Sequence, residues 1–271
     1  MLNKHESVEK EKPQSNSKKN GVVKNGNGVN GHTLMDFSKI KTGGKFLTNV
    51  VGSEKVFCKE LFSEEEKMIY EAMKDFATNE LLPLSQNELN KKDEKLIRNL
   101  VEQMGELGFL GIDVPEKYGG SEMTKTGMCI LAEGISFCGS PSFCTVWNVQ
   151  TSIGSLGIIW YGNDEQKKKW LPEICSGEKI AAFGLTEPEA GSDATNSKTT
   201  GVLSDDGKHY ILNGQKIFIS NGAWADTFIV ALKIDGKFSS IVVEKGTPGF
   251  DVGKEEKKMG MHGSSTVPLY F

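Results

Sequence analysis

The sequence predicts an α+β fold in which an all-α helical domain precedes an antiparallel β-barrel or β-sandwich domain. Apolar residues recur with the period of a helix up to about residue 178, and from Lys179 onward they alternate with the period of a strand. The length of 271 residues suits one or two domains. We therefore divide the chain into a tail over 1–35, a helical domain over 36–178 and a β domain over 179–271.

The first 35 residues are rich in Lys, Glu, Asn, Ser and Gly and offer almost nothing to bury. Such a composition does not offset the entropy of ordering, so we expect a disordered tail. An RNA- or membrane-binding arm is less favoured, because the six Lys of this tail are scattered and diluted by Glu. The tail also lacks the apolar core of a secretory signal and the Arg-rich character of a mitochondrial transit peptide. We therefore expect a cytoplasmic location, with the mitochondrial matrix less favoured.

Two helices are predicted in the first part of the helical domain. Ser63 and Glu66 have the spacing of a capping box and begin the first helix, which ends or turns away at Pro83. The second helix begins near Asp93, carries apolar residues on one face and ends at Gly108.

The rest of this domain contains further helix-length segments. Two apolar stretches cover about 124–138 and 144–160. Another helix begins at Asn163, where Gln166 has capping-box spacing, and runs to about Cys175. These segments complete an all-α layer without an internal repeat.

The β domain consists of short strand-like segments separated by turns that contain N-G, D-D-G and T-P-G. The segments cover residues 180–185, 209–214, 215–220, 226–234 and 239–246. Because no helical pattern intervenes, we expect antiparallel pairing. A last strand-like piece, TVPLYF, reaches Phe271 with no further element, so we expect the protein to continue beyond it.

Composition excludes several functions. The net charge is −4, the body is acidic and Arg98 is the only Arg, which argues against nucleic acid and against Arg clamps on phosphate. The five Cys are dispersed without a C-x-x-C, and the four His lie far apart. We therefore expect neither a disulfide framework nor a zinc site, and a reducing compartment. No apolar run is long enough for a membrane span.

Two segments are candidates for binding chemistry. LTEPEAGSD, residues 185–193, bends at Pro188 and Gly191 and offers hydroxyls and backbone N–H groups to a phosphate or a heteroaromatic edge. FISNG, residues 218–222, places an aromatic residue before polar residues at a strand end. A polar turn in which Ser192 and Asp193 bond their own backbone, and an aromatic core strand that runs into a turn, remain open as alternatives.

Other catalytic signatures are missing from the sequence. There is no Ser/His/Asp set, and no dinucleotide or Walker glycine loop follows a strand. Glu187 and Asp193 are the closest carboxylate pair, but both fall in a turn, which disfavours either as a general base.

At these residues a family resemblance becomes plain. FGLTEPEAGSDA resembles the flavin-binding signature of the acyl-CoA dehydrogenase family, and GQKIFISNGAWAD resembles its second flavin segment. GFLGIDVPEKYGG resembles a landmark of the family's helical domain, and KMGMHGSSTVPLYF looks like the stretch before its third, helical domain. The resemblance covers about 55–271 and is strongest to the long- and very-long-chain branch.

The resemblance implies an FAD enzyme that oxidises an acyl-CoA to its trans-2-enoyl-CoA, the first step of fatty-acid β-oxidation. Its electrons pass to an electron-transferring flavoprotein, and the full-length protein is expected to be a homodimer or homotetramer. An acyl-CoA oxidase and a non-catalytic scaffold of the same fold are the alternatives, and the intact LTEPEAGSD loop disfavours the scaffold.

The resemblance also implies residue roles. Leu185 and Thr186 would bond the N1/O2 edge of the flavin ring, and Ser192 would bond the FAD pyrophosphate and lie near the CoA part of the substrate. Phe218 would pack on the flavin and Ser220 would bond near N5. The predicted cofactor-binding set is Phe183, Leu185, Thr186, Gly191, Ser192, Phe218, Ile219 and Ser220.

Three departures from the family pattern matter. Phe218 stands where the family often has Trp, and Ser220 stands where it often has Thr. The family's Glu base belongs to a C-terminal helical bundle that is absent from this sequence, so we expect the base beyond Phe271. We therefore name no catalytic residue within the chain and expect this 271-residue piece alone to be inactive.

Overall fold

The computed structural model describes residues 59–271, and for Ser85 and Gln86 it describes only the backbone. Residues Lys59–Phe271 form one compact unit. The predicted disordered tail over 1–35 and the first part of the predicted helical domain, 36–58, lie outside the described residues.

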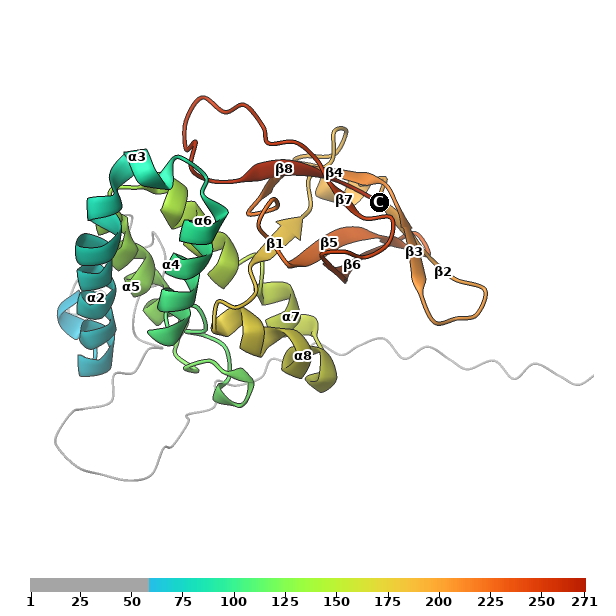
Figure 1. Cartoon of the computed structure of the whole chain (residues 1–271). Coiled ribbons are helices and arrows are strands. Elements are labelled where there is room, and N and C mark those ends of the chain that lie inside the picture. The colour runs from blue at the N-terminus through green and yellow to red at the C-terminus, as the bar shows by residue number, and fades with distance from the viewer. Residues whose placement is uncertain (1–58) are drawn as a thin grey trace, which may run out of the picture. The chain divides into compact units, whose positions relative to one another are not determined.

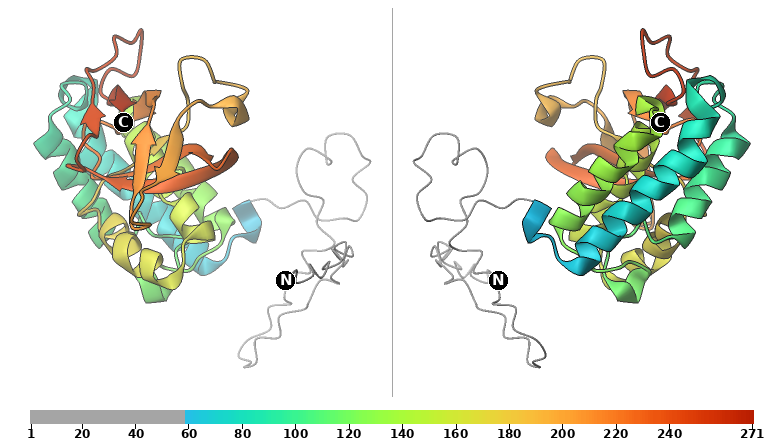
Figure 2. Two further views of the ribbon diagram at one scale, coloured as in Figure 1. Left: turned by 90° about the vertical axis from the view of Figure 1, so that its right-hand side faces the viewer. Right: turned by 90° about the vertical axis from the view of Figure 1, so that its left-hand side faces the viewer.

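The helical layer follows the predicted order. Its α-helices are α2 (Glu64–Phe76), α3 (Ser85–Leu89), α4 (Glu94–Glu106), α5 (Lys125–Ile135), α6 (Pro141–Thr151), α7 (Leu156–Tyr161) and α8 (Asp164–Cys175). Both predicted capping boxes are present, Ser63 with Glu66 and Asn163 with Gln166. Helices α2 to α6 lie on one side of the unit and the strands on the other, as Figure 1 and the turned views of Figure 2 show.

Two predicted helices have different ends. Helix α2 stops at Phe76, and a π-helical turn over Ala77–Leu81 leads to Pro83, whose ring nitrogen has no N–H for a regular helix. The stretch 144–160 is interrupted after Thr151. A Cβ on Gly154 would stand 2.7 Å from the Val149 carbonyl oxygen, so a side chain would not fit in this turn.

The strands are β1 (Ala181–Gly184), β2 (Thr200–Leu203), β3 (Tyr210–Asn213), β4 (Gln215–Ser220), β5 (Thr227–Ile234), β6 (Lys237–Glu244), β7 (Asp251–Val252) and β8 (Thr266–Tyr270). They form a five-stranded sheet in which β6 pairs with β5 and the remaining order is β1-β5-β2-β3, and a three-stranded sheet ordered β4-β8-β7. The prediction of a helical domain followed by a β domain is confirmed.

The expectation of purely antiparallel pairing needs one correction. Strands β1 and β2 both pair with β5 in parallel, along the same edge, while β6 pairs antiparallel with the other edge. Strand β5 has six buried residues in succession before two half-buried ones, a pattern typical of a strand covered on both faces. Long connections separate β1 and β2 from β5, which allows the parallel arrangement.

The core joins the two layers. One cluster of buried side chains contains Met73, Leu100 and Phe143 from helices together with Phe228 and Leu269 from strands. A second cluster links α7 and α8 with β1 and β5. Helix α8 ends at Cys175 and β1 begins at Ala181, and the predicted boundary at 178/179 stays a prediction. Within residues 59–271, no helix is both long and apolar enough to cross a bilayer.

Candidate functional site

The two segments singled out in the sequence lie side by side. The backbone N–H of Ile217 in β4 donates to the carbonyl oxygen of Thr186 at 2.9 Å. The ammonium of Lys216 donates to the carbonyl oxygen of Leu185 at 3.1 Å. The loop after β1 is therefore fixed to the strand that carries Phe218 and Ser220.

A β-bulge shapes this part of β4. The register between β4 and β8 shifts between Lys216 and Ile219, and Phe218 has a φ of +61°. The residue is 61% exposed. The bulge leaves the Ile217 N–H to bond the loop after β1 and turns Phe218 outward, although a left-handed backbone is unfavourable for a bulky residue. Strain of this kind occurs mainly at functional sites.

Asn221 fixes the end of the same strand. Its side chain is fully buried and donates to the carbonyl oxygens of Val146 in α6, at 3.1 Å, and of Ala181 in β1, at 3.3 Å. The residue has a φ of +63°, a conformation that Asn tolerates better than most residues. Ser220 is thereby held between a strained Phe218 and an anchored Asn221.

A buried ion pair supports the loop from below. The Lys216 ammonium lies 2.7 Å from a carboxylate oxygen of Glu187, and the two side chains are 0% and 4% exposed. Glu187 also accepts the backbone N–H groups of Lys198, at 2.5 Å, and Thr199, at 3.0 Å. Burial would raise the pKa of Glu187, but these hydrogen bonds together lower it to about 2. Glu187 is therefore an ionised anchor, which agrees with its being disfavoured as a general base.

The outer surface of the loop offers unsatisfied polar groups. Within residues 59–271, the hydroxyls of Thr186, Ser192 and Ser220 have no hydrogen-bond partner, and Ser192 is exposed. A Cβ built on Gly191 would meet nothing within 4 Å. The Asp193 carboxylate accepts the Thr195 hydroxyl at 3.2 Å and makes no capping bond to the backbone of Ala194–Asn196. Neither Ser192 nor Asp193 therefore shows the side-chain bond to its own backbone that the polar-turn interpretation requires.

Two predicted site residues, Phe183 and Ile219, have apolar side chains that pack into the core. Ile219 is 2% exposed and belongs to the main core, so only its backbone can contact a ligand. Phe183 is half-buried and packs against the second cluster, beside Ile158 and Ile229. Side chains alternate between the two faces of a strand, and the Gly184 face of β1 lies against Lys216. The Phe183 side chain therefore lies on the opposite face of β1, away from Lys216. The flavin roles of both residues stay predictions.

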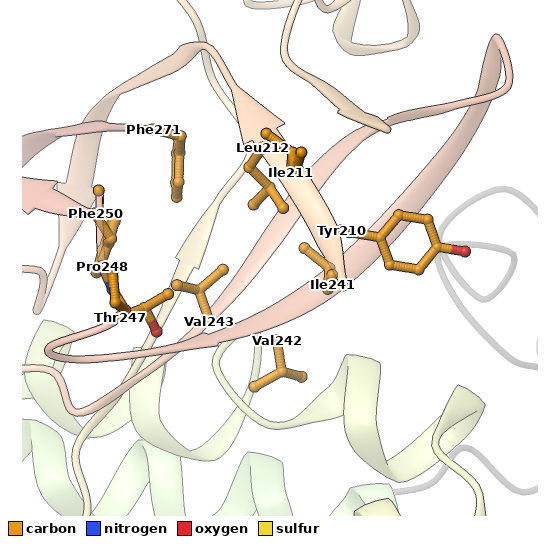
Figure 3. A pocket seen from close by; sticks show the side chains of 11 residues that line it. Tyr210, Ile211, Leu212, Ile241, Val242, Val243, Thr247, Pro248, Phe250 and Phe271 are labelled. Carbon is orange, nitrogen blue, oxygen red and sulfur yellow. The ribbon is translucent and has the colours of Figure 1, made fainter. Parts of the chain in front are cut away.

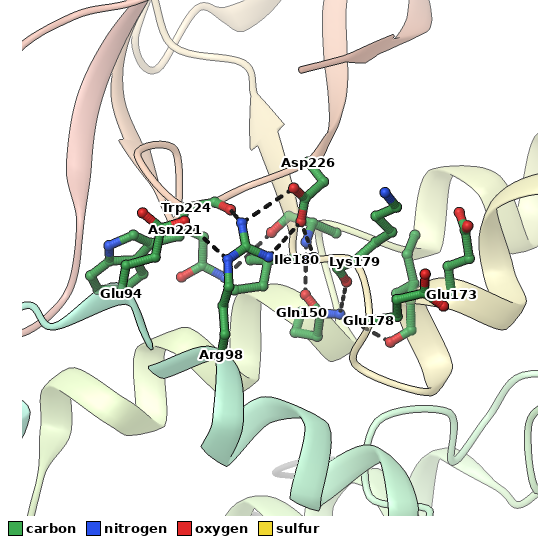
Figure 4. Close-up of polar contacts among 12 residues, drawn as sticks. Glu94, Arg98, Gln150, Glu173, Glu178, Lys179, Ile180, Asn221, Trp224 and Asp226 are labelled. Carbon is green, nitrogen blue, oxygen red and sulfur yellow. Dashed lines mark hydrogen bonds and ion pairs between the residues drawn. The ribbon is translucent and has the colours of Figure 1, made fainter. Parts of the chain in front are cut away.

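A polar cluster connects the helices to the base of this site (Figure 4). The Arg98 guanidinium donates to the Asp226 carboxylate at 2.9 Å and to the Trp224 carbonyl oxygen at 2.6 Å. Asp226 also accepts the Ile180 N–H at 3.0 Å. The Gln150 side chain accepts the Ala181 N–H at 2.8 Å. Helices α4 and α6 thus hold both the start of β1 and the turn after Asn221.

Sequence reasoning missed the groups that position the site. Lys216 stands directly before the apolar run 217–219 of β4 and is fully buried, and a buried ammonium implies a buried partner. Glu187 was noticed only as a weak candidate base. Asn221 and Gln150 bond backbone carbonyls and N–H groups from distant elements, which no local pattern shows.

A separate cavity of about 420 Å³ lies elsewhere in the β layer (Figure 3). Residues of β3, β6 and the turn at 247–250 line it, together with Phe271, whose ring stacks on that of Phe250 at 5.2 Å between centroids. None of the predicted flavin-binding residues is among its lining residues.

These observations define a class of two-layer α+β proteins in which β1 and the bulged β4 carry a strained aromatic and free hydroxyls at the surface. The family described as "Acyl-CoA dehydrogenase, N-terminal domain" matches residues 63–178, and "Acyl-CoA dehydrogenase, middle domain" matches residues 182–271. The chain belongs to the acyl-CoA dehydrogenase family, and its described part carries these two domains.

Individual relatives agree with this assignment. A probable acyl-CoA dehydrogenase of Bacillus subtilis is 46% identical over 231 residues, which are 85% of this chain and 38% of the relative. The solved acyl-CoA dehydrogenase of Bacillus anthracis complexed with FAD has a TM-score of 0.78 at 46% identity, covering 84% of this chain and 39% of that one. The chain thus spans less than half the length of both.

A third likeness concerns electron transfer. A solved structure described as the electron transferring flavoprotein of Acidaminococcus fermentans, concerned with flavin-based electron bifurcation, has a TM-score of 0.71 at 38% identity. The match covers 79% of this chain and 56% of that chain.

Proposed function

We propose that the protein is an FAD-dependent oxidoreductase that oxidises acyl-CoA to trans-2-enoyl-CoA in fatty-acid β-oxidation. The observation that carries the proposal is the bulge of β4, which exposes Phe218 at a positive φ beside the loop of residues 185–193. The FAD complex of the Bacillus anthracis relative, 46% identical to this chain, supports the choice of cofactor.

The chemistry of the described residues fits FAD. The exposed ring of Phe218 offers a flat face for stacking against an isoalloxazine. Thr186 and Ser220 contribute free hydroxyls for the isoalloxazine ring. Hydrogen-bond donors to that ring favour the negative charge of a reduced flavin. Ser192 provides a hydroxyl for the pyrophosphate, and the open space at Gly191 admits a phosphate close to the backbone. When bound, FAD supplies the acceptor for a hydride.

The roles of the chain's own residues follow from their anchors. The Ile217 N–H and the Lys216 ammonium orient Leu185 and Thr186, so the flavin edge meets a preorganised loop. Glu187 is engaged by Lys216 and Asp193 by Thr195, so we assign neither as the catalytic base.

The finer parts of the proposal rest on relatives and on sequence. We propose Ser192 as a contact to the CoA part of the substrate and an electron-transferring flavoprotein as the electron acceptor. The likeness to the Acidaminococcus fermentans structure supports that acceptor. A homodimer or homotetramer, a cytoplasmic location and a preference for long acyl chains remain predictions.

The test is an FAD titration of the 271-residue chain, followed by quenching of flavin fluorescence. A Phe218→Ala variant should bind FAD roughly 2- to 12-fold more weakly, because aromatic stacking contributes about 0.5–1.5 kcal/mol. Phe238→Ala is the matched control, since Phe238 is 48% exposed on β6 and outside the proposed site. Equal affinity of the wild type and the Phe218 variant, or equal losses in both variants, would contradict the proposal.

A further inference from the structure

Two cysteine side chains contact each other at the junction of α5 and α6. The sulfur atoms of Cys138 and Cys144 lie 3.5 Å apart, and both residues are free thiols. Cys138 ends the 3-10 turn Ser136–Cys138, and Cys144 lies in the first half of α6. Gly139, with a φ of +66°, turns the chain between them, so residues six apart in the sequence meet.

The other cysteines of the described residues provide references. Within residues 59–271, Cys129 is exposed and Cys175 is buried, and neither contacts another sulfur atom. Burial raises the pKa of Cys175 to about 12, which keeps that thiol neutral and unreactive. The sulfur–sulfur contact therefore distinguishes the pair Cys138 and Cys144 from the accessible single thiol of Cys129 and the inert buried thiol of Cys175.

The surroundings of the pair favour a reactive sulfur. The Ser140 backbone N–H donates to the Cys138 sulfur at 3.4 Å, and the Cys144 thiol is in hydrogen-bond contact with the same atom. The hydrogen bond with Cys144 is the main cause that lowers the pKa of Cys138 to about 7, and the same contact raises the pKa of Cys144. The pair loses one proton near neutral pH and keeps the other.

Access to the pair is one-sided. Cys138 is 0% exposed, whereas Cys144 is half-buried and can meet a small solute. To form a bond of ~2.05 Å, the two sulfur atoms must approach by about 1.5 Å from their separation of 3.5 Å.

We propose that Cys138 and Cys144 form a reversible disulfide when the protein meets a hydroperoxide. Transfer of the shared proton across the 3.5 Å contact to Cys138 leaves the accessible Cys144 sulfur as the thiolate, because either sulfur can be the donor in this contact. The Cys144 thiolate then takes an oxygen atom from the hydroperoxide and becomes a sulfenic acid, while the O–O bond breaks and an alcohol or water leaves. The Cys138 sulfur then attacks the sulfenic sulfur. The S–S bond forms, the S–O bond breaks, and the departing hydroxide takes a proton to give water. The two thiols lose two electrons and two protons, and the hydroperoxide gains them.

Peptide mapping of the wild-type chain tests the proposal directly. Trypsin leaves Cys129, Cys138 and Cys144 in one peptide, residues 126–167, because no Lys or Arg lies between. The chain is treated with equimolar hydrogen peroxide, alkylated without reductant and digested. We expect the peptide to carry one alkyl group, on Cys129, and to be two hydrogen atoms lighter. Treatment of the oxidised chain with dithiothreitol before alkylation should restore three alkyl groups to this peptide.

Other results would overturn the proposal. Three alkyl groups after peroxide, oxygen retained on either sulfur of the pair, or a bond to Cys129 would each do so.

Variants sharpen the assignment. Cys138→Ala and Cys144→Ala should each abolish the bond and leave the remaining thiol alkylated or oxygenated, whereas Cys129→Ala should keep the bond. If an alanine variant does not fold, the wild-type map still decides. No flavin is needed in this experiment, so its failure would be distinct from a failure of the proposed FAD site.

Discussion

Replacing Lys216 by Met probes the anchor beneath the candidate site. Methionine is similar in length but uncharged, so Lys216→Met leaves the 4% exposed carboxylate of Glu187 without its cation. Breaking one side of a buried pair costs about 3–5 kcal/mol, a large part of the ~5–15 kcal/mol that holds a typical domain together. The substitution should therefore destabilise the whole unit as well as the loop.

The size of the stability loss can be worked from the pKa of the Glu187 carboxylate. Glu187 has a pKa lowered from 4.5 to about 2, which corresponds to about 3 kcal/mol of stabilisation of the ionised form. That figure includes the hydrogen bonds from Lys198 and Thr199, and these bonds survive the substitution. For a unit of this size, a loss of about 3–5 kcal/mol lowers Tm by about 6–20 °C.

Thermal unfolding followed by circular dichroism measures this effect. Lys237→Met is the matched control, because Lys237 is exposed on β6 and should shift the free energy of unfolding by less than ~0.5 kcal/mol. Adding Glu187→Gln to Lys216→Met removes the stranded charge and should recover more than half of the lost Tm. A Lys216→Met chain that melts within about 2 °C of the wild type would show that Lys216 does not stabilise the Glu187 carboxylate, and so would a double variant without recovery.

Three further predictions follow from the site. The pKa of Glu187 is about 2 in the folded chain and 4.5 ordinarily, so the stabilisation that its ionised carboxylate gives to the fold is complete above pH ~4.5 and is lost as pH falls toward ~2. Acid titration of the unfolding free energy should show that loss in the wild type and not in Glu187→Gln. Asn221→Gly keeps the positive φ but loses the bonds to Val146 and Ala181, and urea unfolding should show a cost of about 1–3 kcal/mol. The 271-residue chain with added FAD should not bleach anaerobically with acyl-CoAs, because Glu187 and Asp193 are engaged elsewhere; bleaching would show a base within the chain.

The elements with local signals were predictable from the sequence. The capping-box spacing at Ser63 and at Asn163 predicts the start of a helix at each, and the structure contains both capping boxes. The switch of hydrophobic period near Lys179 separates helices from strands, because a strand and a helix bury different sets of positions. Strand β2 was missed, since Gly201 weakens its strand pattern and its partner β3 makes up for that only in the folded sheet.

The site was predictable as segments and not as geometry. The loop of residues 185–193 and the segment after Phe218 were found, and the structure joins them through Thr186 and Ile217. The bulge that turns Phe218 outward depends on the register between β4 and β8, which the sequence of β4 alone does not determine. The parallel pairing of β1 with β5 escaped prediction for the same reason, since it depends on a long-range contact.

The FAD affinity of a Gly191→Val chain tests most directly whether FAD binds against the loop of residues 185–193. A Cβ at Gly191 meets nothing within 4 Å beyond its chain neighbours, so a valine there enters the space that we assign to the pyrophosphate. Gly260→Val is the matched control, because a Cβ there also meets nothing within 4 Å. Both variants should melt with the wild type. We expect Gly191→Val to lose FAD binding while Gly260→Val retains it. An unchanged FAD affinity in Gly191→Val would show that FAD does not bind against the loop of residues 185–193.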